Sequence, residues 1–150
     1  MKHLLIIDDE PAICTSLRFA LEDAYQVVTA TNAAEGLRYA KETSFDLCLL
    51  DLKLGNADGI DVLQALKTIQ PQLVVIIMTA YGTIRSAVDA VKKGAYSYLT
   101  KPLQMDELRS LLQQAAQVAE LNRNIDASSA PLSEKYGAFG LVGKSPLMQQ

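Results

Sequence analysis

Residues 4–9 read LLIIDD, and this run of four apolar residues ending in two aspartates decides the fold. A strand without polar alternation is typical of a parallel sheet that helices cover on both faces. Further apolar runs lie at residues 26–30, 47–50, 73–78 and 97–99, separated by segments with apolar residues at helical spacing. We therefore predict an α/β protein, (βα)5, in which right-handed crossovers build a doubly wound parallel five-stranded sheet.

Two of the intervening segments carry a helical stripe of apolar residues. The stripe of the first comprises Ile13, Leu17, Ala20, Leu21 and Ala24. The stripe of the fourth comprises Ile84, Ala87, Val88, Val91 and Ala95. Residues at these spacings share one face of a helix, so each stripe is expected to cover the sheet.

A last helix is expected to begin near Met105 and to keep spacings of three and four residues along one stripe. The stripe comprises Leu108, Leu111, Ala115, Val118, Asn122 and Ile125. Asn122 falls on this stripe, and two interpretations stay open. In one, Asn122 occupies a core position of a short dimeric coiled coil, where a buried Asn specifies register. In the other, the helix packs on the core and frays into a linker.

The composition after this helix turns to Ser, Ala, Pro and Gly over residues 126–140, which is typical of a linker. A length of 150 residues suits one domain with a tail. We therefore expect a first domain over residues 1–122, a helical extension and linker over 123–140, and the start of another domain over 141–150.

The composition excludes several classes of protein. A hydrophobic content of 49% and a charged content of 21% are ordinary for a globular protein. The net charge of −3, without a basic cluster, argues against direct nucleic-acid binding. Neither a signal peptide nor a membrane-spanning stretch is present, so a cytoplasmic location without membrane contact is expected. Cys14, Cys48 and His3 are isolated and are interpreted as structural residues, not as metal ligands or a disulfide.

Polar side chains follow four of the five predicted strands. In an open parallel sheet, ligands bind beyond the carboxyl ends of the strands, so these side chains are expected to converge. The group comprises Asp8, Asp9 and Glu10 after the first strand, Asp51 after the third, Thr79 and Ala80 after the fourth, and Thr100, Lys101 and Pro102 after the fifth.

The carboxylates of this group need a cation. Three carboxylates about 5 Å apart repel one another by about 3 kcal/mol per pair at an effective dielectric constant of about 20. Lys101 supplies one compensating charge, and a hard divalent ion with oxygen ligands supplies the rest. Mg2+ fits because it binds through one or two carboxylates, waters and a phosphate. We therefore expect a Mg2+ site with Asp8 and Asp9 as metal ligands.

Asp51 is the best candidate for a nucleophile that takes a phosphoryl group as an aspartyl phosphate. It stands alone at a strand end and precedes a loop with Gly and Asn, open to an incoming donor. Mg2+ and Lys101 would neutralise the equatorial oxygens, because positioning and charge stabilisation dominate phosphoryl transfer.

Each of these residues also has a purely structural interpretation. The acidic residues before Pro11 suit a helix N-terminus, Thr79 suits a helix cap, and Lys101-Pro102 suits a turn. Their joint position at the strand ends of one sheet favours the functional interpretation.

The chain resembles the receiver domain of two-component response regulators over about residues 2–119. The resemblance implies a CheY-like, flavodoxin-like fold with strand order 2-1-3-4-5. It also implies a signalling domain that promotes its own phosphorylation by a sensor histidine kinase, not an enzyme. The motifs that carry it are Asp8-Asp9, Asp51, Thr79-Ala80 and Lys101-Pro102 at successive strand ends, with Tyr98 at the position of the family's switch aromatic residue.

The resemblance implies a metal-binding set. Asp9 and Asp51 would bind Mg2+ directly, together with the backbone carbonyl of Lys53. Asp8 would act through a water molecule.

The resemblance also implies the phosphate contacts and the switch. Thr79 and Lys101 would contact the phosphoryl oxygens, and Thr79 and Tyr98 would form the switch. The bond between Lys101 and Pro102 would be cis. One departure is Gly55, which stands where the family usually has Pro and is expected to loosen the loop beside the site.

The last residues carry a second resemblance. Residues 141–148, LVGKSPLM, resemble the opening of the AAA+ domain of NtrC-type, sigma-54-dependent activators. Gly143-Lys144-Ser145 is not a phosphate-binding loop, because that motif needs a Gly where this chain has Ala138. The resemblance implies a fragment of a homodimeric transcriptional activator whose AAA+ and DNA-binding domains act on sigma-54 RNA polymerase.

Two rival functions are compatible with the same fold. A flavodoxin-type electron carrier needs Ser, Thr and Gly after the first strand, where Asp8, Asp9 and Glu10 would repel a flavin phosphate. A phosphatase of the haloacid dehalogenase type needs a second Asp two residues after the nucleophile, where this chain has Lys53. Both rivals are therefore disfavoured.

Overall fold

The computed structural model describes residues 1–55, 57–80 and 84–132, and for Ile84 and residues 123–132 the backbone only. Two compact units divide the chain, Met1–Ala119 and Glu120–Gln150. The domain start predicted over residues 141–150 lies outside the described residues. The three predicted domain boundaries therefore stay predictions.

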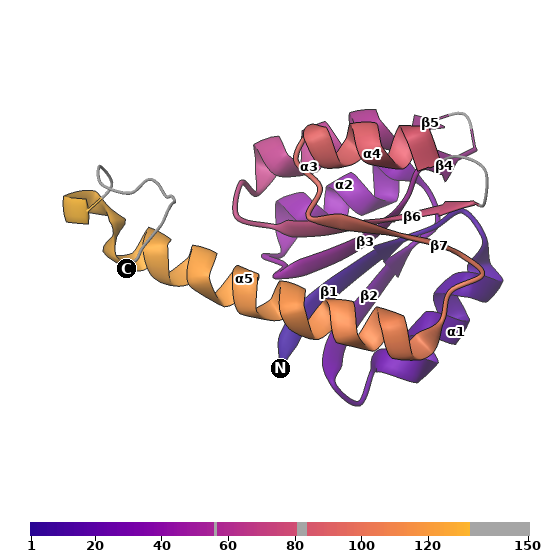
Figure 1. Cartoon of the computed structure of the whole chain (residues 1–150), viewed down its shortest axis with the longest axis horizontal. Coiled ribbons are helices and arrows are strands. Elements are labelled where there is room, and N and C mark those ends of the chain that lie inside the picture. Colours follow the sequence, from indigo (N-terminus) through magenta and orange to yellow (C-terminus); the bar gives the residue numbers. More distant parts are fainter. Residues whose placement is uncertain (56, 81–83, 133–150) are drawn as a thin grey trace. The chain divides into compact units, whose positions relative to one another are not determined.

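A parallel sheet of five strands forms the centre of the first unit (Figure 1). Its strands are β1 (Lys2–Ile7), β2 (Tyr25–Ala30), β3 (Leu47–Asp51), β6 (Val74–Ala80) and β7 (Ser97–Lys101). Their order in the sheet is β2-β1-β3-β6-β7. Because β6 and β7 are the fourth and fifth strands of this sheet, the predicted order 2-1-3-4-5 is confirmed.

Helices cover both faces of the sheet. One face carries α1 (Pro11–Leu21) and the part of α5 (Met105–Leu132) that lies in the first unit. The other face carries α2 (Ala33–Glu42), α3 (Gly59–Ile69) and α4 (Ile84–Lys92). Such an arrangement requires strands that are apolar on both sides, which is what the uninterrupted apolar runs of the sequence indicate.

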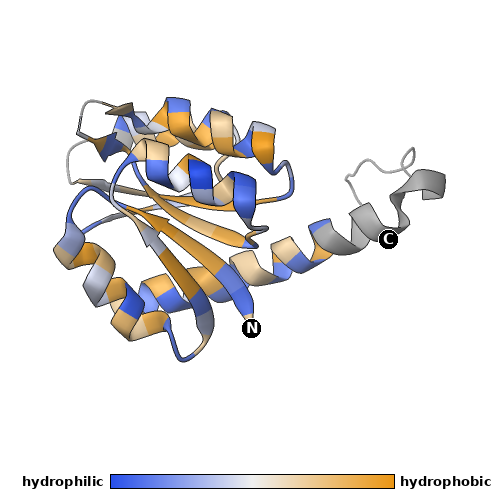
Figure 2. Ribbon diagram, turned by 180° about the vertical axis from the view of Figure 1, so that it is seen from behind, coloured by the Kyte–Doolittle hydropathy of each residue, from blue (hydrophilic) through white to orange (hydrophobic). Residues whose placement is uncertain are grey.

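Side chains alternate between the two faces along each strand. Leu4 and Ile6 pack with α1 and α5, whereas Leu5 and Ile7 pack with α2, α3 and α4. All four are fully buried, and burying each such side chain contributes about 1.5–3 kcal/mol relative to exposure. Figure 2 shows the result as mostly hydrophobic strands in the middle, with helices of mixed hydropathy around them.

Two residues of the predicted helical stripes lie elsewhere. Ala24 is exposed, because α1 ends at Leu21 and Ala24 lies in the turn that follows. Val88 is 41% exposed, whereas Ala90, which the predicted stripe omits, is fully buried. The face of α4 that meets the sheet therefore runs through Ala87 and Ala90, and this rotation is set by packing against β6 and β7.

The predicted stripe of the last helix is shifted by one position at its centre. Leu112 is fully buried, while Leu111 is only partly buried at the edge of the same cluster. The helix continues to Leu132, so it includes the first residues of the segment 126–140 that has linker composition. Asn122 is partly buried, and its place in a dimer seam stays a prediction.

Two short strands in the loop after β3 are absent from the prediction. They are β4 (Lys53–Leu54) and β5 (Ala57–Asp58), which pair antiparallel as a separate two-stranded sheet. Strands of two residues carry no periodicity that a sequence pattern can reveal. They form one wall of the pocket described below.

Both cysteines are buried and free, which confirms their interpretation as core residues. In the part of the chain that the structure describes, no helix combines the length and the apolar character that crossing a membrane requires.

Candidate functional site

The register of the sheet brings the predicted strand ends together. Ile7 pairs with Leu50, so Asp8 and Asp51, which follow them, lie side by side at the carboxyl edge. Thr79, in turn, pairs with Thr100 at the same edge. The polar residues at the ends of β1, β3, β6 and β7 therefore lie close together at the carboxyl edge of the sheet.

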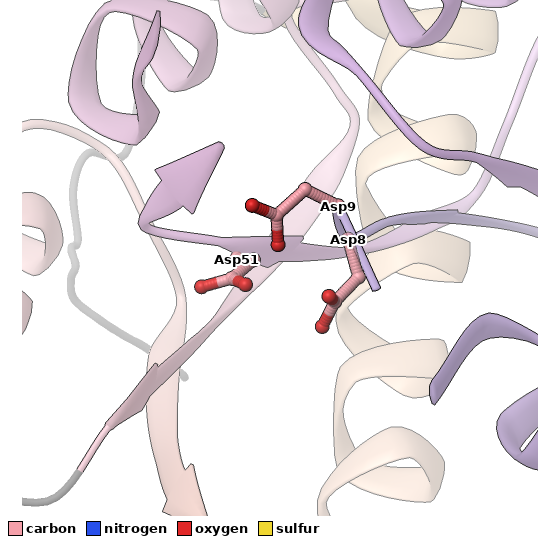
Figure 3. Close-up of side chains that lie close together, drawn as sticks. All are labelled: Asp8, Asp9 and Asp51. Carbon is pink, nitrogen blue, oxygen red and sulfur yellow. The ribbon is translucent and has the colours of Figure 1, made fainter. Parts of the chain in front are cut away.

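Three carboxylates gather at this edge, as Figure 3 shows. One oxygen from each of Asp8, Asp9 and Asp51 lies within 4.8 Å of the others. Asp8 is fully buried and Asp51 is 5% exposed, whereas Asp9 is exposed to solvent. The predicted acidic cluster is therefore present in the structure, with two of its members largely shielded from water.

Lys101 bridges the two buried carboxylates. Its Nζ donates hydrogen bonds to Oδ2 of Asp8 at 2.8 Å and to Oδ2 of Asp51 at 3.1 Å. Burial disfavours the charged ammonium, but the hydrogen bonds to Asp8 and Asp51 outweigh that effect and raise the pKa of Lys101 above its usual value. The Lys101 side chain is therefore a fixed positive charge between two carboxylates.

For Asp51, in contrast, burial is the dominant influence on the pKa. It raises the pKa of Asp51 above its usual value, although hydrogen bonds from the Lys53 amide and from Lys101 oppose the rise. The Lys53 amide and Lys101 therefore favour the ionised form of Asp51, against the effect of burial.

Backbone amides orient all three carboxylates. Each amide donates to one carboxylate oxygen at about the usual N–H···O length. The pairs are Glu10 N with Asp8 Oδ1 at 2.9 Å, Lys53 N with Asp51 Oδ1 at 3.1 Å, and Gly55 N with Asp9 Oδ2 at 3.1 Å.

An open pocket of about 590 Å³ lies over this cluster. Thr79, almost fully buried at the end of β6, lines it together with Asp9, Glu10, Asp51 and Lys101. Sequence reasoning missed four further lining residues. These are Leu52 directly after Asp51, Asp58 and Ile60 around the start of α3, and Ser86 on α4.

The structural interpretations of the same residues find little support. Glu10 occupies the N-cap position of α1 and makes no side-chain capping hydrogen bond there. Thr79 and Lys101 belong to strands β6 and β7. The bond between Lys101 and Pro102 is cis, as the resemblance implied.

Gly59 is a second feature that sequence reasoning missed. A Cβ atom on Gly59 would lie 2.5 Å from Cα of Leu52 and 2.6 Å from its carbonyl oxygen. The Gly59 amide donates to that carbonyl at 2.9 Å. Only a residue without a side chain lets α3 begin this close to the backbone that follows Asp51. The adjacent Asp58, which caps α3, is the local signal for this start.

Tyr98 lies in β7, paired with Ile77. Its ring is partly buried against the cluster that α2, α3 and α4 form with the sheet.

The donor set fits a divalent cation with oxygen ligands. Mg2+ bonds oxygen at about 2.0–2.1 Å, so neighbouring ligand oxygens around it lie roughly 3–4 Å apart. The carboxylate oxygens of Asp8, Asp9 and Asp51, which lie within 4.8 Å of one another, are close to that spacing. Lys53 lines the pocket beside these carboxylates.

The chain is similar to a transcriptional regulatory protein and to two solved structures, one of which is a response regulator. It is 39% identical to "Transcriptional regulatory protein ZraR" of Klebsiella oxytoca over 148 residues, which are 97% of this chain and 32% of that protein. It is 33% identical to a response regulator of Burkholderia pseudomallei solved with a phosphorylated aspartic acid, a calcium ion and citrate, with a TM-score of 0.71 and coverage of 87% and 74%. It is 29% identical to NtrX of Brucella abortus in complex with ADP, with a TM-score of 0.79 and coverage of 83% and 29%.

The chain spans about a third of the length of the curated relatives it matches, as the 32% coverage of ZraR illustrates. The family model "Response regulator receiver domain" matches residues 4–113, which include every strand end described above. With the fold, the acidic cluster and this match in agreement, the chain belongs to the family of response regulator receiver domains.

Proposed function

We propose that this receiver domain accepts a phosphoryl group on Asp51, with Mg2+, from the phosphohistidine of a sensor histidine kinase. The observation that carries the proposal is the position of Asp51. Its carboxylate lies in an open pocket, 3.1 Å from the ammonium of Lys101 and within 4.8 Å of two further carboxylates. The Burkholderia relative with a phosphorylated aspartic acid and a calcium ion supports the same chemistry.

The transfer exchanges one bond to phosphorus for another. A carboxylate oxygen of Asp51 attacks the phosphorus, the bond from phosphorus to the histidine nitrogen breaks, and the imidazole leaves with the bonding pair and takes a proton. Lys101, freed from part of its contact with Asp51, neutralises charge on the phosphoryl oxygens. Thr79 borders the same space and offers its hydroxyl to one of those oxygens.

The acidic residues would hold the cation. Asp9 and Asp51 would bind it directly with the backbone carbonyl of Lys53, and Asp8 would act through water. When bound, Mg2+ supplies positive charge that offsets the carboxylates and the incoming phosphate. Asp8 in addition keeps Lys101 in place through the 2.8 Å hydrogen bond.

The conformational change that follows phosphorylation of Asp51 would pass through Thr79 and Tyr98. A phosphate on Asp51 offers an acceptor to the Thr79 hydroxyl, and the space this vacates lets the partly buried Tyr98 ring turn inward. The surface of α4, β7 and α5 changes as a result. The domain would exchange between one state with the Tyr98 ring outward and another with the ring inward. Phosphorylation shifts this equilibrium only as far as the phosphate group interacts more favourably with one state than with the other.

The whole protein is proposed to be a longer transcriptional activator. The matched relatives extend far beyond the length of this chain, ZraR is a transcriptional regulatory protein by name, and the NtrX structure contains ADP. Together with the resemblance of residues 141–148, this supports an AAA+ domain and a DNA-binding domain in a cytoplasmic, homodimeric, sigma-54-dependent activator. The ATPase activity would reside in that domain and not in the receiver.

Phosphorylation of the purified chain by acetyl phosphate and Mg2+ tests the proposal. Intact-mass spectrometry should show one phosphoryl group on the wild type and on the control Asp61→Asn, which changes an acidic residue in the first turn of α3. Asp51→Asn should remain unmodified. Full modification of Asp51→Asn would overturn the assignment, and repeated turnover of acetyl phosphate at a rate of many per second would favour a phosphatase.

A further inference from the structure

Asp9 is held differently from the other two carboxylates of the cluster. Asp8 and Asp51 each accept a hydrogen bond from the amide two residues further along the chain. Asp9 accepts its hydrogen bond from Gly55, which is 46 residues away. This contact joins the loop after the first strand to the loop after the third strand, so it depends on the tertiary structure.

Gly55 can make this contact because of its backbone conformation. Its φ is +58°, in the left-handed region that glycine and asparagine adopt most readily. A Cβ atom at this position would meet nothing within 4 Å, so the backbone angle and not space limits which residues fit. Proline, the usual residue of the family here, has no N–H and fixes φ near −65°. The contact is therefore a property of this chain's own departure from the family pattern.

We infer that Gly55 is a positioning residue for the cation site, whose amide orients the Asp9 carboxylate and couples the β4–β5 loop to metal binding. The inference rests on the proposed function. Asp9 is exposed, so without an anchor its side chain samples several rotamers that binding must then reduce to one. The Gly55 amide occupies one acceptor position of Oδ2 and leaves Oδ1 open to a cation.

The same hydrogen bond changes the interpretation of the loop. Sequence reasoning expects Gly55 to loosen it, whereas in the structure Gly55 directly follows β4 and is tied to Asp9 across the pocket. Fixing one side chain in advance of binding is expected to strengthen Mg2+ binding about three- to tenfold.

Isothermal titration of Mg2+ into the whole chain measures this effect in three variants. Gly55→Pro removes both the amide and the left-handed angle, and its dissociation constant for Mg2+ should rise about three- to tenfold. Gly55→Asn keeps the amide and tolerates the angle, so it should restore most of the affinity. Gly94→Asn, a change at another glycine with positive φ (+123°) that does not line the pocket, should bind Mg2+ as the wild type does.

A second measurement avoids any dependence on the folding of the proline variant. In 1H–15N NMR spectra without Mg2+, the Gly55 amide proton should shift upfield and exchange faster with solvent in Asp9→Ala than in the wild type. An unchanged Gly55 amide would overturn the inference. So would equal Mg2+ affinity of Gly55→Pro and the wild type, or a loss in Gly55→Asn as large as in Gly55→Pro. A wild type that binds no Mg2+ would instead refute the proposed function, while the NMR comparison would still test the contact itself.

Discussion

Lys101 and Asp8 form a hydrogen-bonded ion pair of 2.8 Å between residues that are 93 positions apart. Asp8 has no solvent-exposed surface, and the Lys101 side chain is 19% exposed. In the sheet, β7 is separated from β1 by β3 and β6. The pair therefore spans the carboxyl edge of the sheet and contributes both to its stability and to the charge balance of the site.

Replacing Lys101 with Met should destabilise the protein by about 3 kcal/mol, because it leaves the buried Asp8 carboxylate without its partner. Urea unfolding followed by circular dichroism measures the loss. The exposed pair of Lys93 and Asp89, at 3.5 Å, provides the control. Lys93→Met should cost less than about 0.5 kcal/mol. Equal losses in the two variants would contradict the importance assigned to the buried pair.

Mg2+ should raise the thermal midpoint of the chain, because a ligand that binds only the folded state stabilises it by mass action. At a free concentration 100 times the dissociation constant, the gain is about 2.7 kcal/mol. Asp9→Asn should remove most of this gain, and excess EDTA should reverse it in the wild type. Differential scanning calorimetry measures the midpoints. A thermal midpoint of Asp9→Asn that responds to Mg2+ as fully as the wild type's does would argue against Asp9 as a ligand.

Gly59→Ala should destabilise the fold by about 1–3 kcal/mol, since the new methyl group would lie 2.5 Å from backbone atoms of Leu52. Gly36→Ala is the matched control. Its methyl group would meet Cδ1 of Ile7 at the same 2.5 Å, but that atom is the end of a side chain that can change rotamer. Urea unfolding should therefore show the larger loss for Gly59→Ala. A larger loss for Gly36→Ala would contradict the close approach described after Asp51.

Neither cysteine should react quickly with a thiol reagent such as dithiobis(nitrobenzoic acid) in the native state. Burial raises the pKa of the Cys48 thiol, and burial together with the nearby Asp8 carboxylate raises that of Cys14. Because the thiolate is the reactive form, both groups are protected by protonation as well as by packing. In urea both should label within minutes. Rapid labelling of one thiol per chain without denaturant would show that the core around Cys14 or Cys48 is accessible to solvent in the native state.

Much of the fold follows from local patterns in the sequence. The apolar runs identify all five strands of the main sheet, because strands buried on both faces tolerate few polar residues. The helices after them complete the crossovers and so imply parallel pairing. The position of Asp51 at the end of a strand suffices to place it at the edge where ligands bind.

Short elements and helix rotation are predicted less well. The strands β4 and β5 contain two residues each, too few for any periodic signal. Val88 is as apolar as a core residue yet 41% exposed, while the smaller Ala90 is fully buried. The predicted stripe of α4 contains Val88 and omits Ala90, and only the packing of that helix on the sheet selects Ala90.

By itself, the sequence determined where the five strands of the main sheet lie and which polar groups stand at their ends, and it predicted that the carboxylates require a cation. The tertiary structure alone decided that Lys101 reaches Asp8, that Gly59 touches Leu52, and that the Gly55 amide holds Asp9. Periodicity and propensity act over a few residues, whereas these contacts join segments whose separation depends on how the whole sheet twists and its loops close. A sequence pattern can therefore place each group at an edge, but the hydrogen bond between two groups exists only once the chain has folded.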